Sequence, residues 1–570
     1  MKVSDYIVEF FINKGVTDIF GYPGGMVTHL MDSLKKYESS IHAHVNYHEQ
    51  ASAFCACAYA QISGKVGVAY ATSGPGATNL ITGICQAYFD SIPVIFITGQ
   101  VNTFEMKKSK YIRQSGFQET DIVSMVKGVT KYATVVKDPT EIKHCLEQAY
   151  EAATTGRKGP VLLDIPMNIL SAQVEEDIQN NTIIFDYELP SEKELEKFEQ
   201  YMSKMLLKAK RPCLLIGNGF SGNEDNEEFI LFLNKAAIPV VSSMLGKGLL
   251  NTSSYSNYYG FIGAYGKREA NFIIAKCDLL LCLGTRLDIR QVGKQRDMFA
   301  PNAQIIRVDI DRVELKSKIH DNDKGFHITT TQAVHILSKL QFGDFLEWNN
   351  ICKNIKQRLM DIDTTIPNEF VRQISKRIKD ECIITTDVGQ NQVWVAQSFC
   401  LQKGQKIVFS GGHGAMGYSI PAAIGAYYGS HKPVLCFCGD GGIQMNIQEL
   451  QFIARENLPI AIIVFDNSSL GMIRHFQEMY FKGQYTQTVA AGGYSVPDFT
   501  KIGNAYGIES TGVSTVDEIA NIDFNIYKPM LINIKLDEKT YVYPKLEYGK
   551  PNQDQDPLLD RKMYNEIMQL

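Results

Sequence analysis

The sequence predicts an α/β protein with three doubly wound parallel-sheet domains, of which the first and third are a duplicated pair. Two stretches, 66–100 and 433–472, each contain an apolar strand, a glycine-rich turn, a helix, a proline and a second apolar strand. Strands such as PVLCFC and IAIIVF are short continuous apolar runs, which are typical of parallel strands covered on both faces. Two copies of one design indicate a duplicated domain. A length of 570 residues also exceeds what one hydrophobic core supports.

Changes in composition along the chain separate the domains. The first covers residues 1–172 and ends before a polar, acidic linker, QVEEDIQNNTIIFDYELPSEKE. A central Rossmann-like domain at 190–345 is predicted from four apolar strands, CLLIGNG, IPVVSS, LLLCLGT and IIRVDID. The third domain covers 368–545. The last segment, 546–570, is a polar tail punctuated by prolines, and we expect it to lie on the surface or to fold over the site.

The composition excludes several functional classes. With 45% hydrophobic residues, 21% charged residues and a net charge of −5, nothing favours binding to nucleic acid or to an anionic membrane. No apolar run approaches the ~20 residues of a membrane helix, and the N-terminus is typical of an amphipathic helix rather than a signal peptide. Several of the 12 cysteines lie in apolar runs, as reduced thiols do. We therefore expect a cytoplasmic protein without a zinc or iron–sulfur site.

The stretch 433–472 carries two polar turns at the carboxyl ends of its strands, where open α/β sheets bind ligands. The first turn holds Asp440 among three glycines, and the second holds Asp466 and Asn467. Asn446 is expected to cap the helix between the two strands. Oxygen-bearing side chains beside bare glycine amides suit Mg²⁺ that holds a diphosphate.

Other motifs have ordinary interpretations. Gly217-x-Gly219-x-x-Gly222 matches the dinucleotide fingerprint, but no acidic residue ends the next strand, so a tight strand–helix turn explains it better than NAD binding. Glu49 begins a helix, where the dipole alone favours a carboxylate; alternatively it is a buried acid that exchanges a proton with a heterocycle. The glycines around Met416 form a helix-entry turn or part of a site. The absence of GxxxxGK[ST] and GxSxG motifs argues against a P-loop ATPase and a serine hydrolase.

Together these motifs resemble one family along nearly the whole chain. GDG at 439–441 followed by Asn467 resembles the thiamine diphosphate signature. The matching segments, in order, are FGYPGG (20–25), HEQ (48–50), ATSGPGATN (71–79), GFQE (116–119), GRKGPVLLDIP (156–166), DVGQNQVW (387–394), GGHGAMGYSIPAAIGA (411–426) and LGM (470–472). The chain is thereby identified as similar to the acetolactate synthase (acetohydroxyacid synthase catalytic subunit) family of the thiamine-diphosphate superfamily.

The resemblance implies thiamine diphosphate (ThDP) and Mg²⁺ as cofactors. Asp440 and Asn467 would bind the metal through side-chain oxygens, and Ser469 through its carbonyl. Glu49 would protonate the aminopyrimidine ring, Gly414 would accept a hydrogen bond from it, and Met416 would hold the cofactor bent in a near-attack arrangement. The full set implied to bind ThDP is Glu49, Gln390, Asn391, Gly414, Met416, Gly439, Asp440, Gly441, Gly442, Asn467, Ser469, Gly471 and Met472.

The implied reaction decarboxylates pyruvate and joins the two-carbon unit to a second carbonyl, most simply pyruvate, giving 2-acetolactate. Glu49, Gln118 and the backbone of Gly25 would act in catalysis. In simple decarboxylases of this superfamily an adjacent His-His pair helps to protonate the intermediate and release an aldehyde. No such pair occurs in this sequence, so the resemblance favours carboligation. The positions implied to contact substrate are Phe117, Arg286, Met472 and Phe476.

Three departures from the family pattern leave the acceptor open. Phe476 stands where the family has a tryptophan, Met26 follows YPGG, and Met167 follows DIP. A nucleotide-linked keto sugar is one alternative acceptor, and a pyruvate oxidase is another alternative activity. A catalytically inactive binding protein of the same fold is a third, against which Glu49, Asp440 and Asn467 argue.

The biosynthetic synthases of the family also carry an FAD that does no redox work. Its approximate contacts match Arg157, Gly217, Gly219, Ser243, Met244, Arg286 and Asp309. Ala264-Tyr265 and GTRLDI depart from the family's sequence there. Because Glu49 and Asp440 fall in different domains, the resemblance implies a homodimer or homotetramer with the active site at the chain interface, and allows a regulatory subunit.

Overall fold

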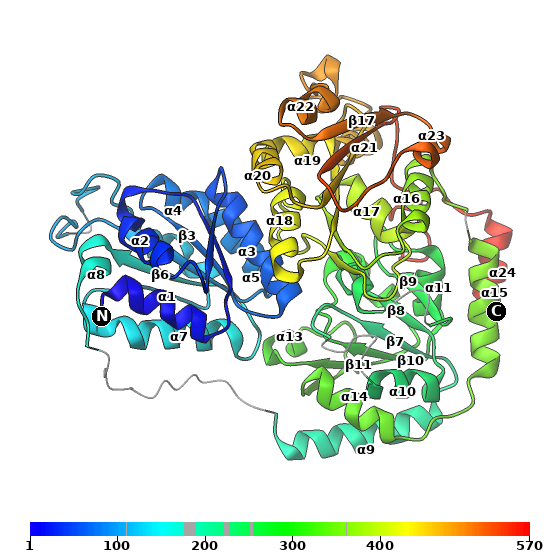
Figure 1. Cartoon of the computed structure of the whole chain (residues 1–570). Helices are drawn as coiled ribbons and strands as arrows, with labels where there is room; N and C mark the ends of the chain where they lie inside the picture. The colour runs from blue at the N-terminus through cyan, green and yellow to red at the C-terminus, as the bar shows by residue number, and fades with distance from the viewer. Residues whose placement is uncertain (110, 176–189, 221–226, 251–254, 361) are drawn as a thin grey trace.

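The computed structural model describes residues 1–570 except 110, 176–189, 221–226, 251–254 and 361 (Figure 1). It contains three six-stranded sheets, and every strand pair within them is parallel. The sheet orders are β2-β1-β3-β4-β6-β5, β12-β11-β10-β7-β8-β9 and β14-β13-β15-β16-β18-β17. The first and third orders are identical once the strands are renumbered, so the predicted duplication is confirmed. The central order, read from the β9 edge, is that of a dinucleotide-binding Rossmann sheet.

The first domain forms the blue and cyan part of Figure 1. Its strands are β1 (Asp18–Gly21), β2 (His42–Val45), β3 (Gly67–Ala71), β4 (Val94–Gln100), β5 (Tyr132–Val135) and β6 (Val161–Pro166). Its helices are α1 (Val3–Asn13), α2 (Thr28–Lys36), α3 (Glu49–Ser63), α4 (Pro75–Asn79), α5 (Ile81–Phe89), α6 (Ile122–Val126), α7 (Ile142–Thr154) and α8 (Met167–Ser171).

The central domain is the green part of the chain in Figure 1. Its strands are β7 (Pro212–Ile216), β8 (Val240–Ser242), β9 (Tyr258–Phe261), β10 (Leu279–Leu283), β11 (Gln304–Asp309) and β12 (Lys324–His327). Its helices are α9 (Glu192–Lys208), α10 (Glu227–Ala236), α11 (Arg268–Lys276), α12 (Ile289–Val292), α13 (Arg312–Lys316), α14 (Thr330–Lys339) and α15 (Leu346–Leu359).

The third domain runs from yellow-green to orange-red in Figure 1. Its strands are β13 (Ile383–Thr386), β14 (Lys406–Val408), β15 (Val434–Gly439), β16 (Ile460–Asp466), β17 (Glu509–Val513) and β18 (Met530–Lys535). Its helices are α16 (Ile366–Arg377), α17 (Gln390–Ser398), α18 (Ser419–Ser430), α19 (Asp440–Met445), α20 (Leu450–Arg455), α21 (Gly471–Tyr480), α22 (Phe499–Ala505) and α23 (Val516–Asn521), and α24 (Arg561–Gln569) belongs to the tail.

The first and third domains pack through α3 and α18, which lie side by side in Figure 1. The helix backbones approach so closely that a Cβ atom at Gly425 would lie 2.0 Å from the Cys55 carbonyl oxygen. The Cys55 thiol donates to the Pro421 carbonyl at 3.1 Å, and Phe54 contacts Tyr418 edge to face. One hydrophobic core therefore extends through both domains.

The prediction that Asn446 caps the helix between β15 and β16 is wrong. Helix α19 begins at Asp440, directly after β15, and Asn446 makes no capping hydrogen bond at the turn that follows. Its amide instead donates to the Gln50 side chain at 3.1 Å and to the Gly417 carbonyl at 2.8 Å. The Asn446 side chain therefore forms hydrogen bonds that connect the first domain to the third.

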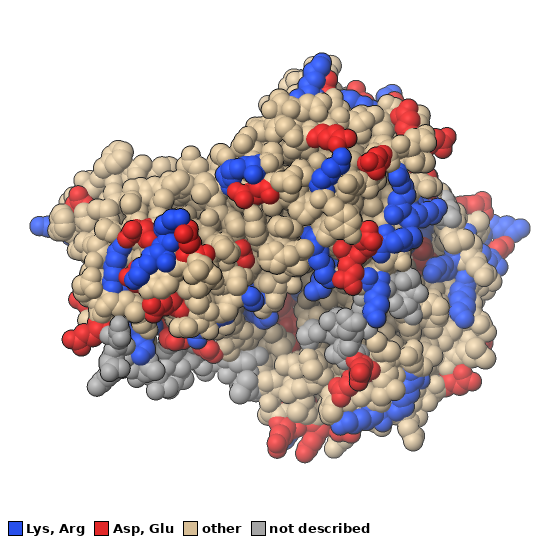
Figure 2. Space-filling view, viewed as in Figure 1, with Lys and Arg blue, Asp and Glu red and all other residues tan. Residues whose placement is uncertain are grey.

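The tail lies against the central domain. Leu559 and Ile567 bury their side chains against Phe272, Ile355 and Leu359, so α24 runs beside α15. Among the described helices, none is both long and apolar enough to cross a membrane. Positive and negative side chains are interspersed on the face shown in Figure 2, with no broad region of one sign.

Candidate active site

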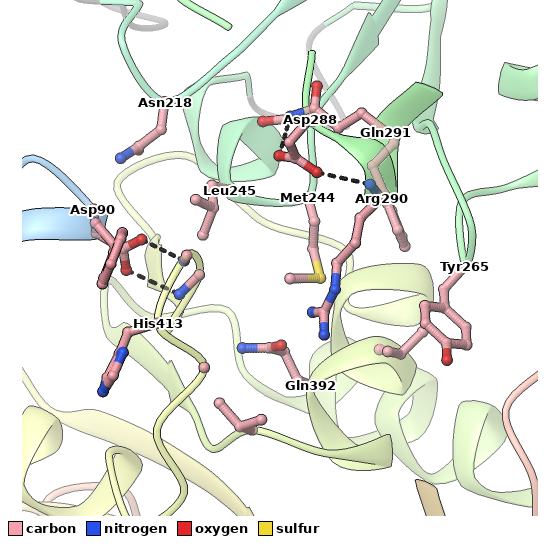
Figure 3. A pocket seen from close by; sticks show the side chains of 18 of the residues that line it. Asp90, Asn218, Met244, Leu245, Tyr265, Asp288, Arg290, Gln291, Gln392 and His413 are labelled. Carbon is pink, nitrogen blue, oxygen red and sulfur yellow. Dashed lines mark hydrogen bonds between the residues drawn. The ribbon is translucent and has the colours of Figure 1, made fainter. Parts of the chain in front are cut away.

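A cavity of about 1140 Å³ lies where the three domains meet. Third-domain strand ends form one end of it, and central-domain loops form the other. First-domain residues 89–91 and 156–158 complete the wall, and Figure 3 shows Asp90 at this side of the cavity. Among the predicted ThDP residues, all but Glu49 line this cavity: Gln390, Asn391, Gly414, Met416, Gly439, Asp440, Gly441, Gly442, Asn467, Ser469, Gly471 and Met472.

Three helices begin at the third-domain end of the cavity. Helix α17 starts at Gln390, α19 at Asp440 and α21 at Gly471, each just after the carboxyl end of a strand or the turn that follows it. The first N–H groups of a helix have no intrahelical partner, and the helix dipole makes this end positive. Three such ends directed at one space are suited to a multiply charged anion such as a diphosphate.

Three oxygen atoms face one another beside these helix ends. Asn467 Oδ1 lies 3.2 Å from Asp440 Oδ2 and 2.9 Å from the Ser469 carbonyl oxygen. Asn467 Nδ2 points away and donates to Gln390 Oε1 at 3.0 Å. With the amide rotated, Asn467 would instead donate to both oxygens, so the orientation that brings three oxygens together is the one that a bound cation would require. A carboxylate, an amide and a carbonyl oxygen are the ligand types that Mg²⁺ prefers.

Both oxygens of the Asp440 carboxylate also accept hydrogen bonds from the protein. Tyr494 donates its hydroxyl to Oδ1 at 2.9 Å, and the Ser469 N–H donates to Oδ2 at 3.3 Å. Burial raises the pKa of Asp440 to about 6. A bound cation would offset that desolvation, so the carboxylate is suited to a site that contains a metal. Within the described residues, no group of three or more His, Cys, Asp or Glu side chains could hold a metal.

The glycines of the third-domain end let the backbone pack closely against neighbouring side chains. A Cβ atom at Gly471 would lie 2.0 Å from Gln390 Oε1, and one at Gly442 would lie 2.5 Å from Asp387 Oδ1. One at Gly441 would lie 2.7 Å from Leu470 and 3.1 Å from the Met416 methyl group. The buried Asn391 Oδ1 has no hydrogen-bond partner within the described part of the chain. An unpaired acceptor oxygen at this place suits a donor group or a cation rather than a phosphate oxygen, so the Asn391 oxygen is free for the metal or for an N–H group of a bound cofactor.

Glu49 lies outside the cavity. It is the first residue of α3, is nearly buried, and accepts a hydrogen bond from the Asn79 amide at 2.9 Å. A Cβ atom at Gly76 would lie 3.1 Å from Glu49 Oε1, so glycine there leaves space in front of the carboxylate. The described cavity lining contains neither Glu49 nor the other first-domain residues with predicted roles in catalysis and substrate binding, Gly25, Phe117 and Gln118.

Phe117 and Gln118 lie on the surface of the first domain beside Gly74. Gln118 has a φ of +65°, which is rare for a residue other than glycine, and a Cβ at Gly74 would lie 2.9 Å from its Cβ. Phe117 is 80% exposed. The buried Glu119 carboxylate shapes this loop by accepting hydrogen bonds from the Lys107 and Ser115 N–H groups at 2.8 and 2.7 Å. Phe117 and Gln118 are thus held at the surface of the first domain, outside the described cavity lining.

Six of the seven predicted FAD-binding residues line the central-domain end of the cavity. Arg157, Gly219, Ser243, Met244, Arg286 and Asp309 line it, whereas Gly217 is not among the described lining residues. A Cβ atom at Gly217 would lie 2.3 Å from the Gly284 carbonyl oxygen, so Gly217 allows β7 and β10 to continue into closely packed turns. The Arg157 guanidinium contacts Asp311 at 3.0 Å and Glu314 at 2.9 Å.

Comparison with known proteins agrees with this arrangement. Residues 1–125, 200–326 and 387–533 match the N-terminal, central and C-terminal domains of thiamine pyrophosphate enzymes. The acetolactate synthase isozyme 2 large subunit of Escherichia coli is 33% identical over 97% of this chain and 99% of its own length. The acetolactate synthase large subunits of Cyanidium caldarium and Lactococcus lactis are 35% and 34% identical, each over 96% of this chain and over 95% and 94% of their own lengths.

The chain belongs to the acetolactate synthase large-subunit family. It is therefore a ThDP-dependent enzyme, with the ThDP-binding domains at its two ends. The predictions of family and fold class are confirmed.

The structure adds candidate residues that the sequence motifs did not identify. Arg290 lines the cavity, and in Figure 3 its guanidinium points into it from α12. Its N–H donates to Asp288 at 2.8 Å, which fixes the start of the helix. Arg286 lines the same space and lies 3.8 Å from the Asp288 carboxylate. The signal in the sequence was the second arginine of GTRLDIR, four positions after the first.

Phe476 lies beyond the cavity lining that is described. It is on α21, is about half exposed, and contacts Tyr480 and Phe481. Together with Ile473, these exposed side chains form an apolar surface next to the cavity. Met472, the other predicted substrate contact on this helix, does line the cavity.

Proposed function

We propose that this protein is an acetolactate synthase that uses ThDP and Mg²⁺ to convert two molecules of pyruvate into 2-acetolactate and CO₂. The observation that carries the proposal is the group of three oxygens on Asp440, Asn467 and Ser469 beneath three helix N-termini. In this proposal these oxygens hold Mg²⁺, and the N–H groups of α17, α19 and α21 hold the diphosphate.

When bound, ThDP supplies a carbon nucleophile for the keto group and accepts the electron pair that remains when CO₂ leaves. The side chains position this chemistry and move its protons. Glu49 holds a proton at a nitrogen of the aminopyrimidine ring, and Met416 supports the cofactor from the third domain. Gln118 and the Gly25 backbone stabilise the oxygen of the reacting carbonyl.

Two arginines support a keto-acid acceptor. Arg286 and Arg290 both line the cavity, and a guanidinium binds a carboxylate through paired hydrogen bonds. We assign the carboxylate of the second pyruvate to this pair. Phe476, in place of the family's tryptophan, favours a second candidate in which a larger carbonyl compound, such as a nucleotide-linked keto sugar, is the acceptor.

A homodimer, or a tetramer built from it, completes the site in this proposal. Glu49, Phe117 and Gln118 lie outside the chain's own cavity, so a partner chain supplies them. The relatives are named large subunits, and by likeness we include a smaller regulatory subunit among the partners of the assembly.

Pyruvate as the only substrate tests the function. With ThDP and Mg²⁺, we expect one 2-acetolactate for each CO₂ released, and no product once a chelator has removed the metal. Tight ThDP binding without acetolactate formation contradicts the proposal. CO₂ release that requires an added nucleotide-linked keto sugar would instead support the second candidate.

We also propose that FAD occupies the central-domain end of the cavity. At about 1140 Å³ the cavity is larger than a usual single-ligand pocket of roughly 300–1,000 Å³. The space between Gly219, Ser243 and Arg286 remains open beyond the proposed ThDP site.

The absorbance spectrum of the purified protein tests this second cofactor. We expect a flavin spectrum, release of FAD on denaturation, and no bleaching when pyruvate is added without oxygen. Steady bleaching would contradict a flavin without redox work and favour a pyruvate oxidase. A colourless protein that binds no added FAD would contradict the FAD proposal itself.

A further inference from the structure

A first-domain carboxylate holds a third-domain loop at the edge of the cavity. Asp90 follows α5 directly and is 6% exposed. Its Oδ2 accepts a hydrogen bond from the Gly411 N–H at 2.9 Å, and its Oδ1 accepts one from the Gly412 N–H at 2.6 Å. Both bonds are drawn in Figure 3, where Asp90 approaches the loop from the side opposite Met244 and Arg290. The carboxylate therefore binds two successive backbone amides of another domain.

Gln86, one turn earlier on α5, extends this contact. Its Nε2 donates to the Asp90 carboxylate, and its Oε1 accepts a hydrogen bond from the Ser410 hydroxyl at 2.7 Å. Ser410 Oγ in turn accepts a hydrogen bond from the Ala415 N–H at 3.2 Å. Gln86, Asp90 and Ser410 are all buried. The loop 410–415 is thus held at its start and near its end by one network.

The two glycines at the contact have no room for side chains. A Cβ atom at Gly411 would lie 2.5 Å from Leu245 Cδ1, and one at Gly412 would lie 2.9 Å from Phe89 Cβ. Leu245 belongs to the central domain and Phe89 to the first, so both domains press on the loop. The backbone can approach Asp90 closely only because these positions are glycine.

The loop leads directly to residues of the proposed cofactor site. Gly414 has a φ of +68°, a left-handed conformation that favours glycine, and lines the cavity. Met416 lines the cavity too, with its methyl group beside Gly441 at the start of α19. Any shift of the backbone at 411–412 would move Gly414 and Met416 relative to Asp440.

We propose that Asp90, supported by Gln86, is a positioning residue that sets the geometry of the ThDP site in its own chain. The proposal rests on the proposed function, in which Gly414 and Met416 contact the cofactor. Each first domain then serves two sites, because its Asp90 orders the loop of its own chain while its Glu49 reaches the site of the partner.

A carboxylate is required because both of its oxygens face N–H donors. Burial raises the pKa of Asp90, whereas the Gly412 and Gly411 N–H groups, the Arg286 charge and Gln86 act in the opposite direction. An asparagine of the same size would keep one acceptor and turn its NH₂ group toward the other N–H. Asp90→Asn therefore loses a charge-assisted hydrogen bond and adds a donor–donor contact without changing the volume.

Asp90→Asn tests the proposal through the loop and the cofactor. We expect amide hydrogen exchange at 410–416 to rise roughly ten-fold, and the ThDP concentration for half-saturation to rise by a similar factor. Trp394, one of two tryptophans, lines the cavity and reports ThDP binding by fluorescence. At saturating ThDP, kcat falls while the KM for pyruvate changes less, because the defect lies in cofactor geometry.

Asp18→Asn is the matched control. Asp18 is a first-domain carboxylate that is also buried, and it contacts Thr17 and His44 in its own domain. We expect it to change stability without changing loop exchange or ThDP affinity. If Asp90→Asn does not fold, Ser410→Ala removes the other end of the network and should give the same pattern.

The proposal is overturned if Asp90→Asn and Ser410→Ala leave exchange at 410–416 and ThDP affinity as in the wild type. It is also overturned if Asp18→Asn changes both as much as Asp90→Asn does. Exchange and ThDP binding do not depend on the product formed. A failure to make acetolactate would therefore count against the proposed function and not against this positioning role.

Discussion

Replacing Glu49 by glutamine lowers kcat by roughly 10³-fold while ThDP still binds, because the carboxylate is the proposed proton-holding group of the cofactor ring. Glutamine keeps the size of the side chain and an oxygen that can accept the Asn79 hydrogen bond, so α3 should keep its position. Single-turnover rates with pyruvate and ThDP titrations measure the two effects separately. Wild-type turnover in Glu49→Gln contradicts the assigned role.

Mixing this variant with Asp440→Asn tests where the site is built. Each variant alone should be nearly inactive. If sites form between chains, a random mixed dimer has one site with Glu49 and Asp440 both intact, so the mixture regains roughly a quarter of wild-type activity. If each chain builds its own site, mixing restores nothing.

Asp440→Asn weakens Mg²⁺-dependent ThDP binding by roughly 100-fold or more, since it removes the only charged group among the three facing oxygens. Calorimetric titration of ThDP with and without Mg²⁺ measures the loss. Binding as tight as that of the wild type would exclude Asp440 as a metal ligand.

Tyr494→Phe provides a graded comparison for that measurement. Tyr494 donates only to Asp440 Oδ1, whereas Oδ2 is the oxygen that faces Asn467. The variant keeps the carboxylate and its charge, so we expect a loss of roughly ten-fold, the size of one hydrogen bond to a charged group of about 1.5 kcal/mol. An effect as large as that of Asp440→Asn would mean that Asp440 acts only through its orientation.

Local sequence patterns predicted that the residues at the third-domain end of the cavity lie close together. Asp440 and Asn467 follow adjacent buried strands, and parallel strands place their carboxyl ends at one edge of a sheet. Strand periodicity and glycine turns are therefore enough to predict that these residues lie close together. The same reasoning predicted the duplicated sheets.

Long-range contacts were beyond such patterns. Asp90 and Gly411 are 321 positions apart, and Tyr494 and Asp440 are 54 apart, so neither pair leaves a local signal. Asparagine is a residue type that favours helix N-caps, but the Asn446 amide instead donates hydrogen bonds to Gln50 of the first domain and to Gly417 of the third. Motif spacing likewise could not tell that Phe476 lies outside the cavity lining, because that depends on how α21 turns relative to the sheet.

The close packing of α3 against α18 has a consequence for biosynthesis. Nearly all of the 15 residues of α3 are buried, and the Cys55 thiol donates a hydrogen bond to the carbonyl of Pro421, 366 positions later in the chain. A ribosome therefore completes the first domain long before the helix that covers this apolar face exists. Until then the nascent chain exposes this apolar surface, which makes the chain prone to aggregate and able to bind chaperones. A truncated product that ends within the central domain should aggregate, whereas the full-length chain covers this face when α18 docks.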